Sequence, residues 1–271
     1  MKRIGVYYIC TGIYKNWFKG FLESLVLFMP DDEKNIIIIS DGLDEYENYQ
    51  SQDGKVKVII IDKIHYYPWP IVTLFKFKYI LDNKISTMDY CFYFNANSCI
   101  LEKSTEFWHT FNNHIDKNDL IVSYHAVNSV KKNKKDFIRG TLIRNKKSTS
   151  YIKEQNYYRL QAAFFGGNAT AVYQMCSEHL NLLTEDLKNN MIAPAADESY
   201  YNKYIHDNPN KLKIHCQMII FPEEKGYLPQ YDNEIFVKLR YNDNYKDNKS
   251  SKDSRNIIEK ILSKLSVLLS K

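Results

Sequence analysis

Two amide side chains follow directly on an apolar stretch in the first half of the chain. Residues 90–94 read Tyr-Cys-Phe-Tyr-Phe, a continuous apolar run typical of a buried strand, and Asn95 and Asn97 come immediately after it. Two carboxylates at this spacing would hold a divalent cation against a diphosphate. Two amides lack that charge, so the charge of a diphosphate bound here would have to be met by cationic side chains of the protein. An Asx turn that closes the strand is the simpler interpretation of the same residues.

A pair of neighbouring carboxylates, Asp197 and Glu198, begins a stretch whose apolar residues have helical spacing. A carboxylate can attack an electron-poor carbon or stabilise a cationic transition state. The plainer interpretation is a carboxylate pair in the first turn of a helix, where the macrodipole favours negative charge. The residue types alone leave both interpretations open.

The elements that must position these residues alternate between strands and helices. Continuous apolar runs predict strands at residues 4–9, 36–39, 56–61 and 90–94, and the two β-branched runs in the middle are typical of strands covered on both faces. Apolar residues at helical spacing predict helices at 17–29, 73–81, 168–183 and 197–205, and short strands follow around 212–221. This order predicts an α/β fold with a doubly wound, mainly parallel sheet. Ligands bind such sheets at the carboxyl ends of the strands, here residues 10–14 and 95–97.

The composition limits the class of partner and the compartment. A net charge of +5, from 37 Lys and Arg against 32 Asp and Glu, is too small to predict nucleic-acid binding by itself. The five cysteines are scattered, without zinc spacing, and are expected to be reduced thiols. The apolar run near the N-terminus is too short for a secretory signal, and no stretch approaches the roughly 20 apolar residues of a membrane-spanning helix. We therefore expect a cytoplasmic protein.

Two basic segments stand apart from this pattern. Residues 130–147 carry eight Lys and Arg with little apolar content and are predicted to form a loop. Residues 256–271 place Ile and Leu on one helical face and most of their Lys off it, as in an amphipathic helix that lies in a membrane interface. A helix packed on the domain's own core, or in a dimer contact, would show the same pattern. We divide the chain into a main domain, residues 1–245, and a polar linker with a basic amphipathic tail helix, residues 246–271.

Motifs in a fixed order over about residues 4–240 resemble those of the retaining α-1,3-galactosyl- and N-acetylgalactosaminyltransferases, the family of the blood-group A and B enzymes. The resemblance is strongest to the bacterial, metal-independent branch. The matching motifs are, in order, Ile9-Cys10-Thr11-Gly12 with Tyr14, Trp69-Pro70, Thr73-Leu74, Phe94-Asn95-Ala96-Asn97, Tyr157-Tyr158, Phe164-Phe165-Gly166-Gly167, and Asp197-Glu198-Ser199 with Asn202-Lys203-Tyr204. Each motif is short, but the ordered set is specific.

The resemblance implies a GT-A-like catalytic domain that transfers galactose or N-acetylgalactosamine from a UDP-sugar to a glycan in α-1,3 linkage. Surface polysaccharide or lipopolysaccharide synthesis is the implied setting, with an oligosaccharide or a lipid-linked glycan as the acceptor. No cofactor is implied, since the branch needs no metal. The basic tail would add a peripheral contact with the inner face of the cytoplasmic membrane.

The resemblance also implies how the donor is held. Ile9, Thr11 and Tyr14 would line the uracil pocket, with Tyr14 stacking on the base. Asn95 and Asn97 would contact the ribose and the diphosphate without a metal ion. The remaining donor contacts would come from Lys76, Gln161, Ala163, Asp197, Lys238 and Arg240.

Four of these positions carry a more specific implication. Lys76 stands where the family usually has Arg, and it keeps the charge but not the planar fork of a guanidinium. Lys238 and Arg240 would close on the diphosphate from the C-terminal segment. Ala163, the third residue of Gln161-Ala162-Ala163, favours galactose, because glycine at this position tends to leave room for an N-acetyl group.

Glu198 is the implied catalytic residue, either as nucleophile or as the electrostatic stabiliser of an oxocarbenium-like transition state. Asp197 would hold hydroxyls of the donor sugar. His125 and Trp69 would bind the acceptor, although a structural histidine at a strand end explains His125 as well. The chain departs from the family in having Ala195-Ala196 where Trp-His is usual, and Ala126 where Pro follows the histidine.

Other functions fit the same residues. One is a metal-dependent GT-A transferase of a different linkage, which analysis of the product linkage would distinguish. Another is an inactive homologue that only binds sugar nucleotides; two Asn in place of two Asp would suit it, and the intact Asp197-Glu198 pair argues against it. A membrane-surface adaptor that uses the tail helix is disfavoured by the long α/β body.

Overall fold

The computed structural model describes residues 2–66, 71–102, 105, 108, 119–124, 146–153, 160–193, 196–208, 213–217, 220–222 and 237–239. Several sequence-based predictions lie outside these residues and stay predictions. They concern Trp69, His125, Tyr157-Tyr158, Ala195, Arg240, most of the basic segment 130–147, and the linker and tail 246–271.

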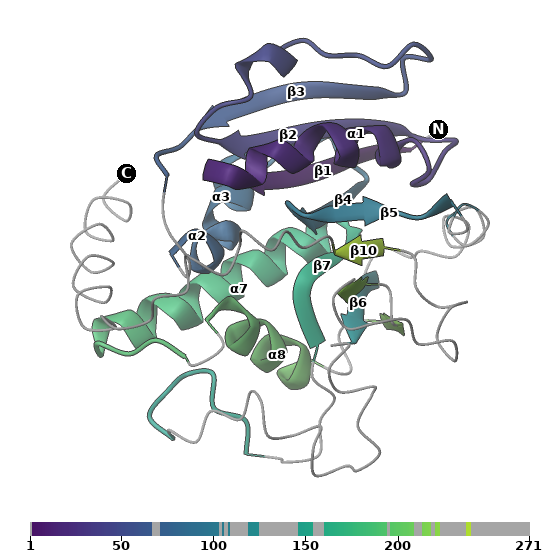
Figure 1. Ribbon diagram of the computed structural model, residues 1–271. Helices are drawn as coiled ribbons and strands as arrows, with labels where there is room; N and C mark the ends of the chain where they lie inside the picture. Colours follow the sequence, from purple (N-terminus) through teal and green to yellow (C-terminus); the bar gives the residue numbers. More distant parts are fainter. Residues whose placement is uncertain are drawn as a thin grey trace.

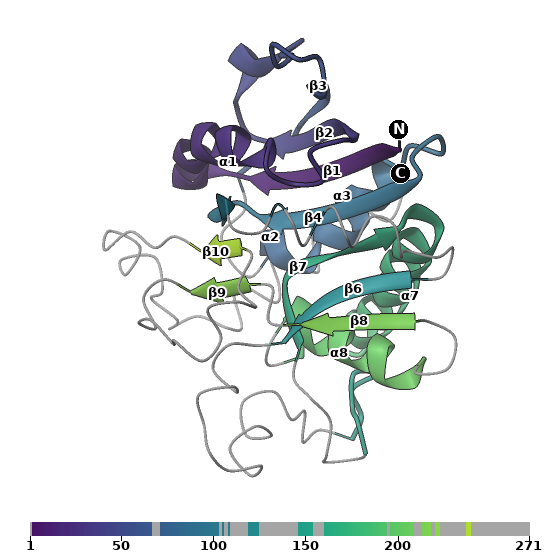
Figure 2. The ribbon, with the colours of Figure 1, turned by 90° about the vertical axis from the view of Figure 1, so that its right-hand side faces the viewer.

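A seven-stranded sheet forms the centre of the domain, in the order β3-β2-β1-β4-β7-β6-β8 (Figures 1 and 2). Its strands are β1 (Arg3–Cys10), β2 (Glu33–Ser40), β3 (Val56–Lys63), β4 (Tyr90–Asn95), β6 (Asp119–Tyr124), β7 (Leu160–Asn168) and β8 (Lys213–Gln217). All neighbours pair in parallel except that β7 is antiparallel to both β4 and β6. The prediction of a doubly wound, mainly parallel α/β sheet in one GT-A-like domain is confirmed.

Helices cover both faces of this sheet. The 3-10 helix η1 (Gly12–Trp17) and α1 (Phe18–Leu25) lie on one face (Figure 1). On the other face lie α2 (Ile71–Leu74), α3 (Lys76–Asp82), α7 (Ala169–Lys188) and α8 (Asp197–Asp207). A further 3-10 helix, η2 (Asp44–Tyr46), follows β2. The expected helix at 17–29 is therefore shorter and preceded by 3-10 turns, and the expected helix at 73–81 is divided in two.

The alternation of side chains along the strands produces two separate cores. On β1, Tyr7 and Ile9 pack towards α3 and α7, whereas Val6 and Tyr8 pack towards α1. This is why β1 and β2 are buried along nearly their whole length, as their continuous apolar runs predict. The same prediction for residues 56–61 is wrong, because β3 is the edge strand of the sheet and Ile59 is 37% exposed.

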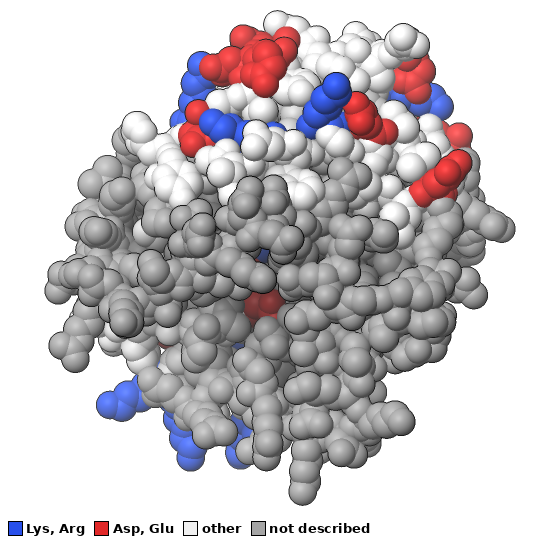
Figure 3. Space-filling model, in the orientation of Figure 1, with Lys and Arg blue, Asp and Glu red and all other residues white. Residues whose placement is uncertain are grey.

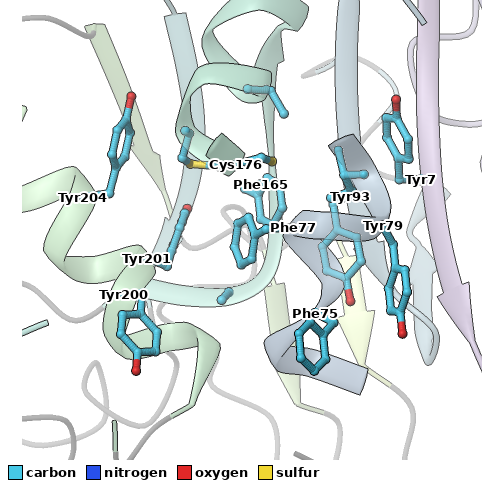
Figure 4. Packing of buried hydrophobic residues seen from close by; sticks show 14 of the residues in the cluster. Tyr7, Phe75, Phe77, Tyr79, Tyr93, Phe165, Cys176, Tyr200, Tyr201 and Tyr204 are labelled. Carbon is cyan, nitrogen blue, oxygen red and sulfur yellow. The ribbon is translucent and has the colours of Figure 1, made fainter. Parts of the chain in front are cut away.

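Stacked aromatic rings fill the core between the sheet and α3 (Figure 4). Phe165 of β7 lies between Phe77 of α3 and Tyr93 of β4, with ring centroids 5.2 Å and 5.1 Å away. On the opposite face Gly166 faces Phe92, and a Cβ added at Gly166 would lie 2.0 Å from Cδ1 of that ring. Gly166, the first residue of the double glycine, is therefore required where β7 crosses the ring of Phe92, because a tightly packed core cannot absorb such a clash.

A three-stranded sheet brings the C-terminal part of the chain next to the end of β4. It consists of β5 (Ser98–Ile100), β10 (Val237–Leu239) and β9 (Ile220–Pro222). Lys238 pairs with Cys99 in the antiparallel ladder between β10 and β5. The backbone of Lys238 therefore lies beside that of Cys99, two positions after Asn97. Its contact with the diphosphate stays a prediction.

Candidate active site at the carboxyl edge of the sheet

The ends of four strands bring most of the predicted site residues to one edge of the sheet. Ile9, near the end of β1, pairs with Asn95 at the end of β4. Because β7 runs in the opposite direction, its first residues lie at this same edge, and Gln161 pairs with Ser123 near the end of β6. Residues separated by more than 150 positions in sequence thus meet where ligands bind in sheets of this type.

The two amides that follow β4 are held by neighbouring side chains. The hydroxyl of Tyr93 donates to Oδ1 of Asn95 at 2.9 Å, and Nδ2 of Asn95 reaches Oδ1 of Asn97 at 3.5 Å. The carbonyl between them, on Ala96, accepts a hydrogen bond from the hydroxyl of Tyr8 at 2.5 Å. Burial and the charge of Asp197 raise the pKa of Tyr93, so its hydroxyl stays a neutral donor. The turn after β4 therefore has a defined conformation.

Lys76 is the buried cation of the site. Only 2% of its side chain is exposed, and its ammonium lies 2.6 Å from Oδ2 of Asp197 and 2.5 Å from the carbonyl oxygen of Ala162. The ammonium also lies over the ring of Tyr93, 4.6 Å from the centroid. A buried charge is tolerated when it is paired and hydrogen-bonded in this way. Lys76 thus joins α3, β7 and the first turn of α8, and its charge is directed at Asp197.

The first turn of α8 carries the carboxylate pair. Asp197 is buried, whereas Glu198 is partly exposed. Asn202 fixes the helix against the edge of the sheet: its side chain accepts from the amide of Leu160 at 2.8 Å and donates to the carbonyls of Leu160 and Glu198 at 3.0 Å and 2.7 Å. Within the motif that begins with Asp197-Glu198-Ser199, Asn202 therefore fixes α8 relative to β7.

The loop after β1 is held by a carboxylate that the sequence analysis did not single out. The amide of Gly12 donates to both carboxylate oxygens of Asp41, at 3.2 Å and 3.1 Å, and Lys15 pairs with the same carboxylate at 3.1 Å. Gly12 has φ +59°, a conformation that favours glycine, and the ring of Tyr66 lies against it. Asp41 comes directly after β2, so the rule that ligands bind at the carboxyl ends of the strands points to it.

Two of the predicted uracil contacts are largely covered by the protein. Thr11 is 3% exposed, and Tyr14 is partly buried against the core beneath α1. The thiol next to Thr11, on Cys10, is buried, and burial raises its pKa to about 12, so it is an inert packing group.

The residues predicted to select the donor sugar line the start of β7. Ala163 and Gln161 are both buried, and Oε1 of Gln161 has no hydrogen-bond partner within the described part of the chain. Buried polar atoms are nearly always satisfied, so this oxygen requires a donor.

No three His, Cys, Asp or Glu side chains are placed to hold a metal ion within the described ranges. Acidic atoms are visible near the centre of the face shown in Figure 3. The side chains of Trp69, His125, Lys238 and Arg240 belong to the parts of the chain that the structure does not describe.

The fold defines a single GT-A-like domain, and the comparisons with known proteins define its family. Residues 3–225 match Glycosyltransferase family 6. The chain is also 33% identical over 230 residues to the "O-antigen biosynthesis glycosyltransferase WbnI" of Escherichia coli, an alignment that covers 82% of this chain and 89% of that protein. The chain belongs to Glycosyltransferase family 6, as the ordered motifs predict. None of its described helices is long and apolar enough to cross a membrane.

Proposed function

We propose that this protein is a retaining glycosyltransferase that moves galactose from UDP-galactose to a glycan in α-1,3 linkage, with N-acetylgalactosamine as the alternative sugar. The observation that carries the proposal is the buried Lys76–Asp197 ion pair, which sets the first turn of α8, with Glu198, beside the strand ends that bear Asn95 and Gln161. The similarity to an O-antigen glycosyltransferase supports surface polysaccharide synthesis as its setting.

In this proposal each carboxylate has its own task. Asp197, oriented by Lys76, accepts hydrogen bonds from hydroxyls of the donor sugar. Glu198 stabilises positive charge on the anomeric carbon as the bond from that carbon to the UDP oxygen breaks. Retention follows either if Glu198 first forms and then loses a bond to the anomeric carbon, or if the acceptor hydroxyl attacks from the face that UDP leaves. In both routes the acceptor oxygen replaces the UDP oxygen and its proton passes to the departing diphosphate or to solvent.

The donor sugar is proposed to be galactose because Ala163 occupies the position that limits an N-acetyl group. The unsatisfied Oε1 of Gln161 beside it fits a contact with a sugar hydroxyl. A screen of UDP-galactose, UDP-N-acetylgalactosamine and UDP-glucose for UDP release, with NMR analysis of the product linkage, tests this. UDP release from none of the three, or a β-linked product, would contradict the proposal.

We expect turnover without a divalent metal, because Asn95 and Asn97 lack the charge that holds one. Activity with EDTA should equal activity with added Mn²⁺, and the Asn97→Asp variant should either gain a response to Mn²⁺ or lose activity through repulsion of the diphosphate. The measurement is UDP release over a titration of Mn²⁺. Loss of wild-type activity in EDTA, restored by Mn²⁺, would assign the protein to the metal-dependent alternative.

We also propose that residues 256–271 bring the enzyme to anionic membranes that hold a lipid-linked acceptor. Each Lys or Arg near such a surface contributes about 1 kcal/mol of attraction. The full chain should therefore sediment with vesicles containing anionic lipid at low salt, and a chain ending at residue 255 should do so less. Equal sedimentation of the two chains would count against the contact.

A further inference from the structure

The backbone directly before the carboxylate pair has an unusual conformation for its residue type. Ala196, the residue that precedes α8, has φ 46° and ψ −125°. This is a region that glycine occupies readily and that side chains with a Cβ adopt only when the surrounding structure imposes it. Because Asp197 and Glu198 follow at once, the conformation of Ala196 contributes to the direction in which α8 begins and to where their side chains point.

A chain of hydrogen bonds runs from α7 to Ala196. The amide of Ala196 donates to the carbonyl of Ala193 at 2.9 Å, and the amide of Ala193 donates to the hydroxyl of Tyr200 at 3.3 Å. That hydroxyl in turn donates to Oδ2 of Asp186 at 3.0 Å. Ala193 and Ala196, the two ends of the turn before α8, are therefore hydrogen-bonded to each other. Through Tyr200, Ala193 is also linked to the carboxylate of Asp186 on α7.

Asp186 is itself held on both of its oxygens. It is fully buried, and it accepts from the hydroxyl of Ser148 at 2.5 Å and from the amide of Thr149 at 2.7 Å in addition to Tyr200. Hydrogen bonds to a buried carboxylate are among the stronger ones in proteins. The carboxylate of Asp186 is thus held in place on α7. Burial, and the negative charge of Asp186 beside it, raise the pKa of Tyr200, so the Tyr200 hydroxyl remains a neutral donor.

We propose that Tyr200 and Asp186 are positioning residues that hold Ala196 in its left-handed conformation and so aim Asp197 and Glu198 into the site. The inference rests on the proposed function of Glu198. It assigns Asp186 and Tyr200 a task in the reaction although neither is among the predicted contacts of the donor or the acceptor. If the two residues only stabilised the fold, their loss would lower stability and leave the turn as it is.

The test compares two Tyr→Phe variants that each remove one buried, hydrogen-bonded hydroxyl. Tyr200→Phe removes the link to the turn. Tyr173→Phe, the matched control, removes a hydroxyl on α7 that bonds to Tyr7 at 2.9 Å and whose partners among the described residues do not include α8. We expect kcat to fall about tenfold in Tyr200→Phe with little change in the donor KM, because small misplacements of catalytic groups are costly, and kcat to stay at the wild-type value in Tyr173→Phe. Asp186→Asn is the second variant, should Tyr200→Phe fold poorly.

A rescue variant separates positioning from stability. Glycine adopts a positive φ without strain, so adding Ala196→Gly to Tyr200→Phe should recover at least half of the lost kcat. A crystal structure of Tyr200→Phe should show Ala196 with a negative φ. Equal kcat losses in the two Tyr→Phe variants, no rescue by glycine, or a positive φ retained at Ala196 would each overturn the inference. The crystallographic result does not depend on the role of Glu198, whereas a fully active Glu198→Gln protein would contradict the proposed function alone.

Discussion

Glu198→Gln is expected to lower kcat by about a hundredfold or more, which is the usual loss when one electrostatic stabiliser of a transition state is removed. The substitution keeps the size and the hydrogen-bonding capacity of the side chain and removes its charge. If that charge acts mainly at the barrier, the affinity for UDP should change little. Initial rates of transfer and UDP titration calorimetry on the same preparation measure the two quantities.

The alternative role of Glu198 is a favourable charge in the first turn of α8. Such a contribution is worth no more than about 1 kcal/mol of stability and would leave the reaction rate nearly intact. Glu185→Gln is the matched control, because Glu185 is an exposed glutamate of α7 that pairs with Lys188 at 3.3 Å. A Glu198→Gln enzyme that turns over as fast as Glu185→Gln would remove Glu198 from the mechanism.

Lys76→Met is expected to have the second large effect, on stability and activity together. It leaves the carboxylate of Asp197 buried without the ammonium that lies 2.6 Å away. Breaking a buried ion pair on one side costs about 3 kcal/mol or more of unfolding free energy. Urea denaturation should show this loss, while Lys203→Met, which breaks the more exposed pair with Asp207 on α8, should cost less than about 1 kcal/mol.

The double variant Lys76→Met with Asp197→Asn separates the two effects. With no charge left to bury, most of the lost stability should return. Transfer activity should stay low, because the proposed contact of Asp197 with the donor sugar is lost. Recovery of activity along with stability would mean that the ion pair serves the fold and has no part in donor binding.

The strands and helices near the site could be predicted from the sequence because their signals are local. Unbroken apolar runs mark β1, β2 and β4. The run of β1 ends at Cys10-Thr11, and the run of β4 ends at Asn95. Spacing alone could not tell that β3 lies at the edge, since a β-branched run reads the same whether one face or both are covered. Asp41 was missed because a single carboxylate after a strand has no motif around it, although its position at the end of β2 was already visible.

The two amides after one strand and the two carboxylates at the start of one helix can be read directly from the sequence. Tertiary structure alone decided which of them meet. Lys76 and Asp197 are 121 positions apart, and they meet because β7 runs against its neighbours and away from the carboxyl edge, and α7 then brings the chain back to that edge, where α8 begins. The positive φ of Ala196 is likewise invisible in the sequence, because alanine by itself avoids this conformation and nothing in the neighbouring residue types announces it.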